Sequence, residues 1–250
     1  MARVAIIGGT GLNRLKNLEI DHREVMHTPY GEPSGPLTFG RLAGNEVVFL
    51  PRHGSGHTIP PHQVNYRANI WALQHIGIEN VIAVAAVGGI RNGLTPATLV
   101  LPDQIIDYTW GRDNTFFEGD REKGVTHIDF TYPYCTRLRE LMLRSAREAG
   151  IPLVETGTYG ATQGPRLETR AEIDRMERDG CDVVGMTGMP EAALAREAEL
   201  CYAAINVVAN RAAGRGEGSG EIRLEEIEQH LERGMEKVRA LLEVVIPALD

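Results

Sequence analysis

The order of apolar segments along the chain constrains its fold more than any other feature. Short apolar runs typical of buried strands alternate with segments whose apolar residues recur every three or four positions, as in helices. The predicted strands are residues 3–7, 47–50, 80–87, 104–108, 153–161, 181–186 and 201–209, and the predicted helices are residues 64–76, 133–149, 169–178, 190–199 and 224–249. This alternation predicts an α/β fold with a mixed, largely parallel β-sheet flanked by helices and ligands at the strand ends.

The size and charge of the chain limit its organisation and its partners. With 250 residues, 42% of them hydrophobic, the chain is long enough for one large core, and no change of composition marks a boundary. We therefore expect a single domain over residues 1–250. A net charge of −8 disfavours nucleic acid and acidic membranes, because both require a basic surface. No apolar run reaches the ~18 residues of a membrane span, so neither a transmembrane segment nor a signal peptide is expected.

The three cysteines indicate the redox environment. Cys135, Cys181 and Cys201 are odd in number and have no metal-type spacing, so we expect reduced thiols in a cytoplasmic protein. No combination of histidine, cysteine and carboxylate residues suggests a metal site.

The loop after the predicted strand 47–50 is an anion-site candidate. Its sequence, PRHGSGHTIP at 51–60, gathers an arginine, two histidines, a serine and a threonine. Guanidinium and imidazole donors are costly to desolvate unless a negative group pairs with them. Phosphate is therefore the first ligand to consider.

Two other strand ends have the same chemistry. GGTG at 8–11 offers backbone N–H groups and a hydroxyl, and GMTGMPE at 185–191 places Thr187 before a helix whose free N–H groups favour an anion. A dinucleotide fingerprint would need a third glycine at position 14, where Arg14 stands, so a nicotinamide cofactor is disfavoured. Three predicted strand ends thus carry residues suited to binding phosphate.

Several motifs together resemble the trimeric purine nucleoside phosphorylase and methylthioadenosine phosphorylase family. They are GGTG at 8–11, PRHG with HTI between 51 and 59, VNYRANIWAL at 64–73, GPR with RAE between 164 and 172, and MT with PE between 186 and 191. The resemblance covers nearly the whole chain in order. It implies phosphorolysis, in which phosphate attacks the anomeric carbon of a purine nucleoside and releases the base. Phosphate is then a co-substrate, and no cofactor or metal is needed.

The resemblance also assigns roles to individual residues. Phosphate would be held by Thr10, Arg52, His53 and Thr187, with the backbone of Ala85 and Ala86 beside it, while Met186 would lie under the ribose. The substrate would also meet the segment Asn210, Arg211 and Ala212. The family further implies a homotrimer, in which the long loop 112–129 with His127 reaches the site of a neighbouring subunit.

Two positions predict which purine is used. Methylthioadenosine phosphorylases carry an aspartate motif where this chain has Asn210 and Ala212. An amide can donate to a 6-oxo oxygen while accepting from protonated N7, which a carboxylate cannot do. Glu168 stands where 6-oxopurine members of the family have a glutamate, which accepts the N1–H of such bases. Leu167 replaces the aromatic residue of the family.

The start of the last predicted helix indicates which sugar is bound. Leu224 occupies the position of a histidine near the 5′-hydroxyl in 6-oxopurine phosphorylases, and Leu224 with Ile227 would form an apolar slot. A 6-oxo base and a 5′-methylthio sugar together predict methylthioinosine as the substrate. The alternatives are a broad inosine and guanosine phosphorylase or a methylthioadenosine phosphorylase.

Two other classes of protein compete with this interpretation. Arg52, His53 and Gly54 also resemble the motif of histidine phosphatases, which place it on the first strand and form a phosphohistidine. A non-catalytic purine-binding protein of the same fold would bind nucleosides without releasing the base.

Overall fold

A computed structural model describes residues 3–12, 17–119, 124–216, 222 and 224–249, apart from the side chains of Leu224 and Glu226. The strands are β1 (Val4–Gly8), β2 (Glu19–Glu24), β3 (Leu37–Leu42), β4 (Asn45–Pro51), β5 (Asn80–Gly89), β6 (Leu99–Val100), β7 (Gln104–Asp107), β8 (Thr158–Ala161), β9 (Val183–Gly185) and β10 (Cys201–Arg211). The helices are α1 (Tyr66–His75), α2 (Thr136–Glu148), α3 (Arg170–Arg178), α4 (Gly188–Glu197) and α5 (Leu224–Val245), with 3₁₀ turns η1 (Pro61–Gln63) and η2 (Ile246–Leu249).

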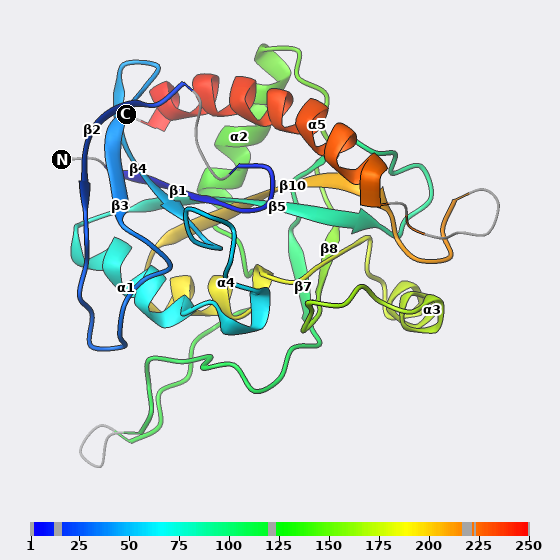
Figure 1. The fold of residues 1–250 in the computed structure, drawn as a ribbon, viewed down its shortest axis with the longest axis horizontal. Helices are drawn as coiled ribbons and strands as arrows, with labels where there is room; N and C mark the ends of the chain where they lie inside the picture. Colours follow the sequence, from blue (N-terminus) through cyan, green and yellow to red (C-terminus); the bar gives the residue numbers. More distant parts are fainter. Residues whose placement is uncertain (1–2, 13–16, 120–123, 217–221, 223, 250) are drawn as a thin grey trace.

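These strands form one mixed sheet with helices on both faces. Along the sheet the order is β2-β3-β4-β1-β5-β9-β8-β7, and β10 pairs with β5 and with β6. Helices α2 and α5 cover one face, α1 and α4 cover the other, and α3 lies beyond β8 (Figure 1). The chain therefore adopts the expected α/β fold, in which one mixed sheet lies between two layers of helices.

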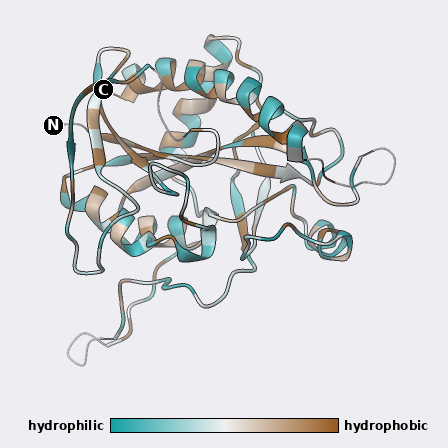
Figure 2. Cartoon of the chain, viewed as in Figure 1, coloured by the Kyte–Doolittle hydropathy of each residue, from teal (hydrophilic) through white to brown (hydrophobic). Residues whose placement is uncertain are grey.

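The central strands are buried on both faces, which explains their continuous apolar sequences. In β1, Val4 and Ile6 pack into the core under α2 and α5, whereas Ala5 and Ile7 pack into the core over α1 and α4. Figure 2 shows these inner strands as mostly hydrophobic and the outer side of α5 as mostly hydrophilic. Parallel strands with both faces covered read as unbroken apolar runs.

Sheet register brings the ends of distant strands together. β1 runs parallel to β4 and to β5, with Gly8 opposite Pro51, and β10 runs parallel to β5. The register of β10 shifts between Val208 and Asn210, which re-aims the end of the strand. The loops after β1 and β4 and the ends of β5 and β10 consequently share one edge.

Most predicted elements are present, with some differences. β8 and β9 are shorter than the predicted strands, and α4 begins at Gly188, with non-helical φ and ψ at Met189. Thr169 and Glu172 form a capping box at the start of α3. The predicted strands omit β2, β3 and β6. β2, with sequence EIDHRE, is exposed throughout, so it carries no apolar alternation.

The cysteine prediction was wrong for two of the three residues. Cys135 and Cys201 form a disulfide, with their Cα atoms 5.1 Å apart, although 66 positions separate them in sequence. The chain before α2 lies against the start of β10, where the Cys135 N–H donates to the Tyr202 carbonyl at 2.7 Å. Spacing along the sequence does not reveal this contact. Cys181 is a buried free thiol. Among the described helices, none combines the length and apolar character that crossing a membrane requires.

Candidate active site

A cavity lies where the three predicted anion-binding segments meet. Its lining comprises Gly9, Thr10, Arg52, His53, Ala85, Ala86, Val87, Gly88, Leu167, Glu168, Val184, Gly185, Met186, Thr187, Ala209, Asn210, Ala212, Ile222 and Ile227. Most residues assigned from the family resemblance are therefore brought together. Val87, Ala209 and Ile222 also line the cavity, although their apolar side chains have no local sequence signal that distinguishes them.

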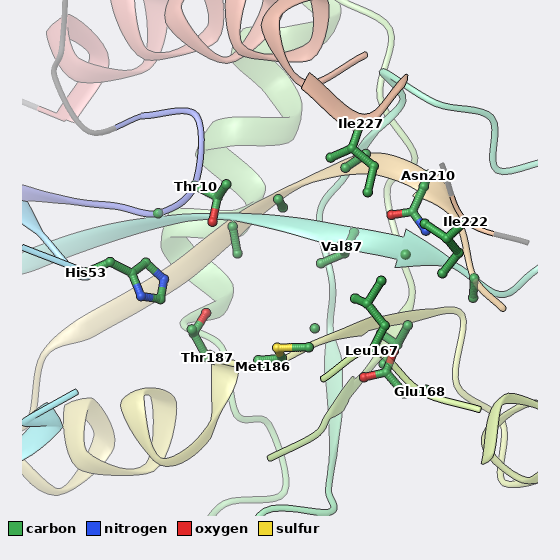
Figure 3. Close-up of a pocket in the computed structure, with 18 of the residues that line it drawn as sticks. Thr10, His53, Val87, Leu167, Glu168, Met186, Thr187, Asn210, Ile222 and Ile227 are labelled. Carbon is green, nitrogen blue, oxygen red and sulfur yellow. The ribbon is translucent and has the colours of Figure 1, made fainter. Parts of the chain in front are cut away.

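The cavity has two polar ends. In Figure 3, Thr10, His53 and Thr187 cluster at one end, and Asn210 and Glu168 lie at the other. Met186 and Val87 lie between these two groups (Figure 3). This separation matches a ligand with an anion at one end and a hydrogen-bonding ring at the other.

At the end of the cavity that holds Thr10, His53 and Thr187, the backbone packs closely around Gly9. A Cβ atom on Gly9 would lie 2.6 Å from the Val84 carbonyl oxygen and 2.8 Å from Nη1 of Arg52. The Arg52 N–H donates to the Gly8 carbonyl at 2.9 Å, which holds the loop after β4 against the end of β1. Glycine is therefore required at position 9 because no side chain would fit.

Arg52 is held by a buried carboxylate. Its Nε donates to Oε2 of Glu191 at 2.6 Å and its Nη2 donates to Oε1 at 2.7 Å, while Nη1 donates to the Val84 carbonyl at 2.9 Å. Burial alone would lower the pKa of Arg52, but the charge and hydrogen bonds of Glu191 outweigh it and hold this pKa above its usual value. The bonds use three N–H groups, so the guanidinium retains donors for a ligand.

Glu191 itself is fully buried and accepts a further bond from the Tyr202 hydroxyl at 2.8 Å. In the sequence, Glu191 stands out only as part of a motif shared with the family. Its pairing with Arg52, 139 positions away, was not predicted.

His53 presents an acceptor to the cavity. Its Nδ1 lies 2.8 Å from the Ile59 carbonyl oxygen, which can only accept, so Nδ1 carries the proton. Burial, followed by the charge of Arg52, lowers the pKa of His53 to about 4. The ring is therefore neutral near pH 7, with a lone pair on Nε2. Nearby, Thr10 Oγ1 lies 3.4 Å from Nε2 of His57, and burial lowers the pKa of His57.

The turn at Thr187 differs from the expectation of free helix N–H groups. The backbone N–H groups of Thr187 and Gly188 donate to the buried Tyr159 hydroxyl at 3.2 and 3.3 Å. They are thus directed to Tyr159, because a buried phenol oxygen requires hydrogen-bonding partners. The hydroxyl of Thr187 still reaches the cavity (Figure 3).

At the other end, the Asn210 amide has a defined orientation. Its Nδ2 donates to the Arg211 carbonyl at 2.7 Å, which leaves Oδ1 and one N–H for a ligand. Arg211 contributes this carbonyl but does not line the cavity, unlike Ala212. Leu167 is 41% exposed at the cavity wall.

Two further predicted site residues are not placed in this cavity. The side chain of Leu224 lies outside the described part of the chain, although the residue begins α5. His127 is exposed on the long loop and does not line the cavity.

Arg112 anchors that long loop to the site. Its Nη1 donates to the carbonyls of Met186 and Met189 at 2.8 and 2.6 Å, and its Nη2 donates to the Gln163 carbonyl at 2.8 Å. Its role could not be read from the sequence, because an arginine in a polar loop has no local signal. Among the residues that the structure describes, no group of three or more histidine, cysteine or carboxylate residues could hold a metal.

The chain belongs to the phosphorylase superfamily, whose model matches residues 3–247. It is 54% identical over 248 residues to a probable S-methyl-5′-thioinosine phosphorylase of Pseudomonas syringae pv. tomato, covering 99% of this chain and 100% of the relative. It is 44% identical over 253 residues to the 6-oxopurine nucleoside phosphorylase of Pyrococcus furiosus, covering 100% and 94%.

The fold is likewise similar to that of methylthioadenosine phosphorylase from Schistosoma mansoni in complex with adenine. The TM-score is 0.93 at 33% sequence identity, and the match covers 100% of this chain and 92% of the other. The family and these relatives identify the chain as a nucleoside phosphorylase. The phosphatase and non-catalytic alternatives are therefore excluded.

Proposed function

We propose that this enzyme cleaves 6-oxopurine nucleosides with phosphate, and that its main substrate is S-methyl-5′-thioinosine. The products are hypoxanthine and 5-methylthioribose 1-phosphate. One observation carries the proposal: a single cavity has an anion-binding cluster at one end and the Asn210 amide with the Glu168 carboxylate at the other. The similarity to the Pseudomonas syringae and Pyrococcus furiosus relatives supports the same choice of base.

In the proposed reaction, the anion end holds phosphate below the sugar. The hydroxyls of Thr10 and Thr187 and the remaining N–H donors of Arg52 bind phosphate oxygens, with the backbone of Ala85 and Ala86 beside them. Because Nε2 of His53 is an acceptor, it takes a hydrogen bond from a protonated phosphate oxygen.

Bond cleavage transfers electrons to the purine. A phosphate oxygen bonds to the anomeric carbon as the bond from that carbon to N9 breaks, through an oxocarbenium-like transition state above Met186. The leaving purine gains the electron pair and takes up a proton from water at N7. Oδ1 of Asn210 accepts the N7–H, because Nδ2 is directed to the Arg211 carbonyl.

The same groups favour a 6-oxo base. The free N–H of Asn210 donates to O6, and Glu168 accepts the N1–H. Adenine has an amino group in place of O6 and a lone pair at N1, so it would leave both protein groups mismatched. Each mismatched buried polar group costs about 1–3 kcal/mol.

The apolar residues on the cavity wall support a methylthio sugar. Ile227 lines the cavity, and Leu224 begins the same helix. An apolar slot gains from burying a methylthio group and offers no partner to a 5′-hydroxyl. Inosine and guanosine, or methylthioadenosine, are the alternative substrates.

Exposed apolar side chains on and beside the long loop indicate an interface between subunits. We propose a homotrimer in which the long loop, carrying His127, contributes to a neighbouring site. On or beside this loop Trp110 is 72% exposed, Tyr132 is 65% exposed and Val125 is 79% exposed, and large exposed apolar groups mark interfaces. Light scattering in solution should give three times the monomer mass. We also propose a cytoplasmic location and a place in purine salvage, with phosphate as a co-substrate and no cofactor.

A base-release assay tests the function. Methylthioinosine, methylthioadenosine and inosine would be incubated separately with enzyme, with and without phosphate, and the free base quantified by chromatography. We expect phosphate-dependent release, with kcat/KM highest for methylthioinosine. Equal cleavage of methylthioadenosine would overturn the assignment of the base, and equal turnover without phosphate would overturn phosphorolysis.

A further inference from the structure

Thr162 does not line the cavity itself, but it is hydrogen-bonded to two residues that do, Gly185 and Glu168. It directly follows β8, and its backbone N–H donates to the Gly185 carbonyl at 2.8 Å. Its own carbonyl accepts from Nη2 of Arg112 at 3.2 Å. Gly185 is the last residue of β9 and precedes the Met186–Thr187 turn. The position of Thr162 is therefore fixed relative to the phosphate end.

The side chain of Thr162 has one proton to donate and two acceptors within reach. Oγ1 lies 2.6 Å from Oε1 of Glu168 and 3.3 Å from the Gly185 carbonyl oxygen. The shorter contact to a charged acceptor is the stronger hydrogen bond. The hydroxyl proton thus belongs to the bond with Glu168, whose other oxygen, Oε2, stays available.

Glu168 also lines a second cavity, which Thr162 and Arg166 line as well, so a cation is available nearby as an alternative partner for its carboxylate. Arg166, two residues earlier, is exposed and forms an ion pair with Glu172 at 2.7 Å. The hydrogen bond and charge of Glu172 raise the pKa of Arg166, and the charge of Glu168 makes a smaller contribution, so Arg166 and Glu168 lie within electrostatic range. If the bond from Thr162 were lost, the half-buried Glu168 carboxylate would be free to turn toward Arg166 and away from the base.

We propose that Thr162 is a positioning residue for base recognition. By binding Oε1, its hydroxyl keeps the Glu168 carboxylate facing inward, so that Oε2 accepts the N1–H of a 6-oxopurine. This inference rests on the proposed role of Glu168. Thr162 neither touches the reacting atoms nor contacts phosphate, so it acts on the choice of base alone.

The test is a comparison of four variants on two substrates. T162V removes the donor while nearly keeping the shape, T162S keeps a hydroxyl, E168A removes the carboxylate, and T162V/E168A combines the two changes. We would measure kcat/KM for methylthioinosine and methylthioadenosine, the KM for phosphate, and the thermal unfolding of each variant. T162A replaces T162V if the latter does not fold.

The expected result is a loss confined to the 6-oxo substrate. A charge-assisted hydrogen bond corresponds to roughly a 10- to 100-fold change, so T162V should lower kcat/KM for methylthioinosine by that factor. Cleavage of methylthioadenosine and the KM for phosphate should change less than about threefold, T162S should restore the wild-type preference, and T162V should have no further effect in the E168A background.

Other outcomes would overturn the inference separately from the function. If E168A shifts the substrate preference but T162V does not, Glu168 reads the base without help from Thr162. An equal effect of T162V with and without Glu168 would mean that Thr162 acts through another contact. A preference unchanged by E168A would overturn both the role of Glu168 and the inference drawn from it.

Discussion

Arg52 and Glu191 form a bidentate ion pair, with bonds of 2.6 and 2.7 Å between side chains that are 1% and 0% exposed. The carboxylate neutralises most of the charge that Arg52 would offer to an anion. Arg52 therefore contributes oriented N–H donors more than net positive charge. The same pair also joins the loop after β4 to α4, so it holds two sides of the anion end together.

Breaking this pair should destabilise the fold. E191A leaves a buried unpaired guanidinium, so we expect the free energy of unfolding to fall by about 3–5 kcal/mol, measured by urea denaturation. The matched control is E155A, which removes the exposed partner of Arg147 at 2.6 Å. This control should cost at most about 1 kcal/mol. Equal losses in the two variants would show that burial adds nothing to the Arg52 pair.

His53 should make stability depend on pH. Its pKa is about 4 in the folded protein and 6.5 for an ordinary histidine, so between these values only the unfolded chain binds the proton. The contribution of His53 to the free energy of unfolding is therefore constant above pH 6.5. It is lost as the pH falls from 6.5 toward 4, and the loss is on the order of 2–3 kcal/mol. The variant H53N should have a flatter stability curve across this window. Parallel curves for the two proteins would contradict the lowered pKa.

Asn210 cannot be exchanged for aspartate without loss. A carboxylate oxygen in place of Nδ2 would face the Arg211 carbonyl, which now accepts a bond at 2.7 Å, and it could not donate to O6. We expect N210D to lower kcat/KM for methylthioinosine about 10- to 100-fold at neutral pH. N210A is the control that removes both polar atoms. An N210D enzyme as active as the wild type would exclude the proposed contacts of the amide.

Tyr159 should stabilise the turn at Thr187, whose hydroxyl is proposed to bind phosphate. The variant Y159F leaves the N–H groups of Thr187 and Gly188 without the hydroxyl that now accepts from both. We expect a loss of about 1–3 kcal/mol in stability and a larger increase in the KM for phosphate than in the KM for nucleoside. Y134F, which alters a buried tyrosine outside the cavity lining, is the control. A phosphate KM raised as much by Y134F would argue against a local effect.

The disulfide should stabilise the protein without serving the chemistry. Cys135 and Cys201 lie 66 positions apart, and closing a loop of this size restricts the unfolded chain by about 2–4 kcal/mol. We expect a reductant, or the double variant C135S/C201S, to lower the unfolding temperature while kcat/KM stays within about twofold. The reductant and the double variant should lower the unfolding temperature by the same amount. If the reductant lowers it further in the double variant, the effect does not come from the disulfide between Cys135 and Cys201.

The sequence by itself determined the fold class and most of the site. Apolar runs alternating with helical periodicity required a covered, largely parallel sheet, because such strands must be buried on both faces. Parallel pairing then places the ends of β1, β4 and β5 at one edge, so the hydroxyl, guanidinium and imidazole groups that follow these strands had to meet. Residue type and strand order suffice for this conclusion.

Only the tertiary structure decided which groups pair within that site. Glu191 under Arg52, the Tyr159 hydroxyl under Thr187 and Thr162 beside Glu168 are contacts between single side chains. Such contacts have no periodic signature, since they depend on packing between elements distant in sequence. The pairing of Cys135 with Cys201 likewise depends on packing between distant elements. β2 is exposed throughout, and its polar residues adopt a strand conformation because they pair with β3.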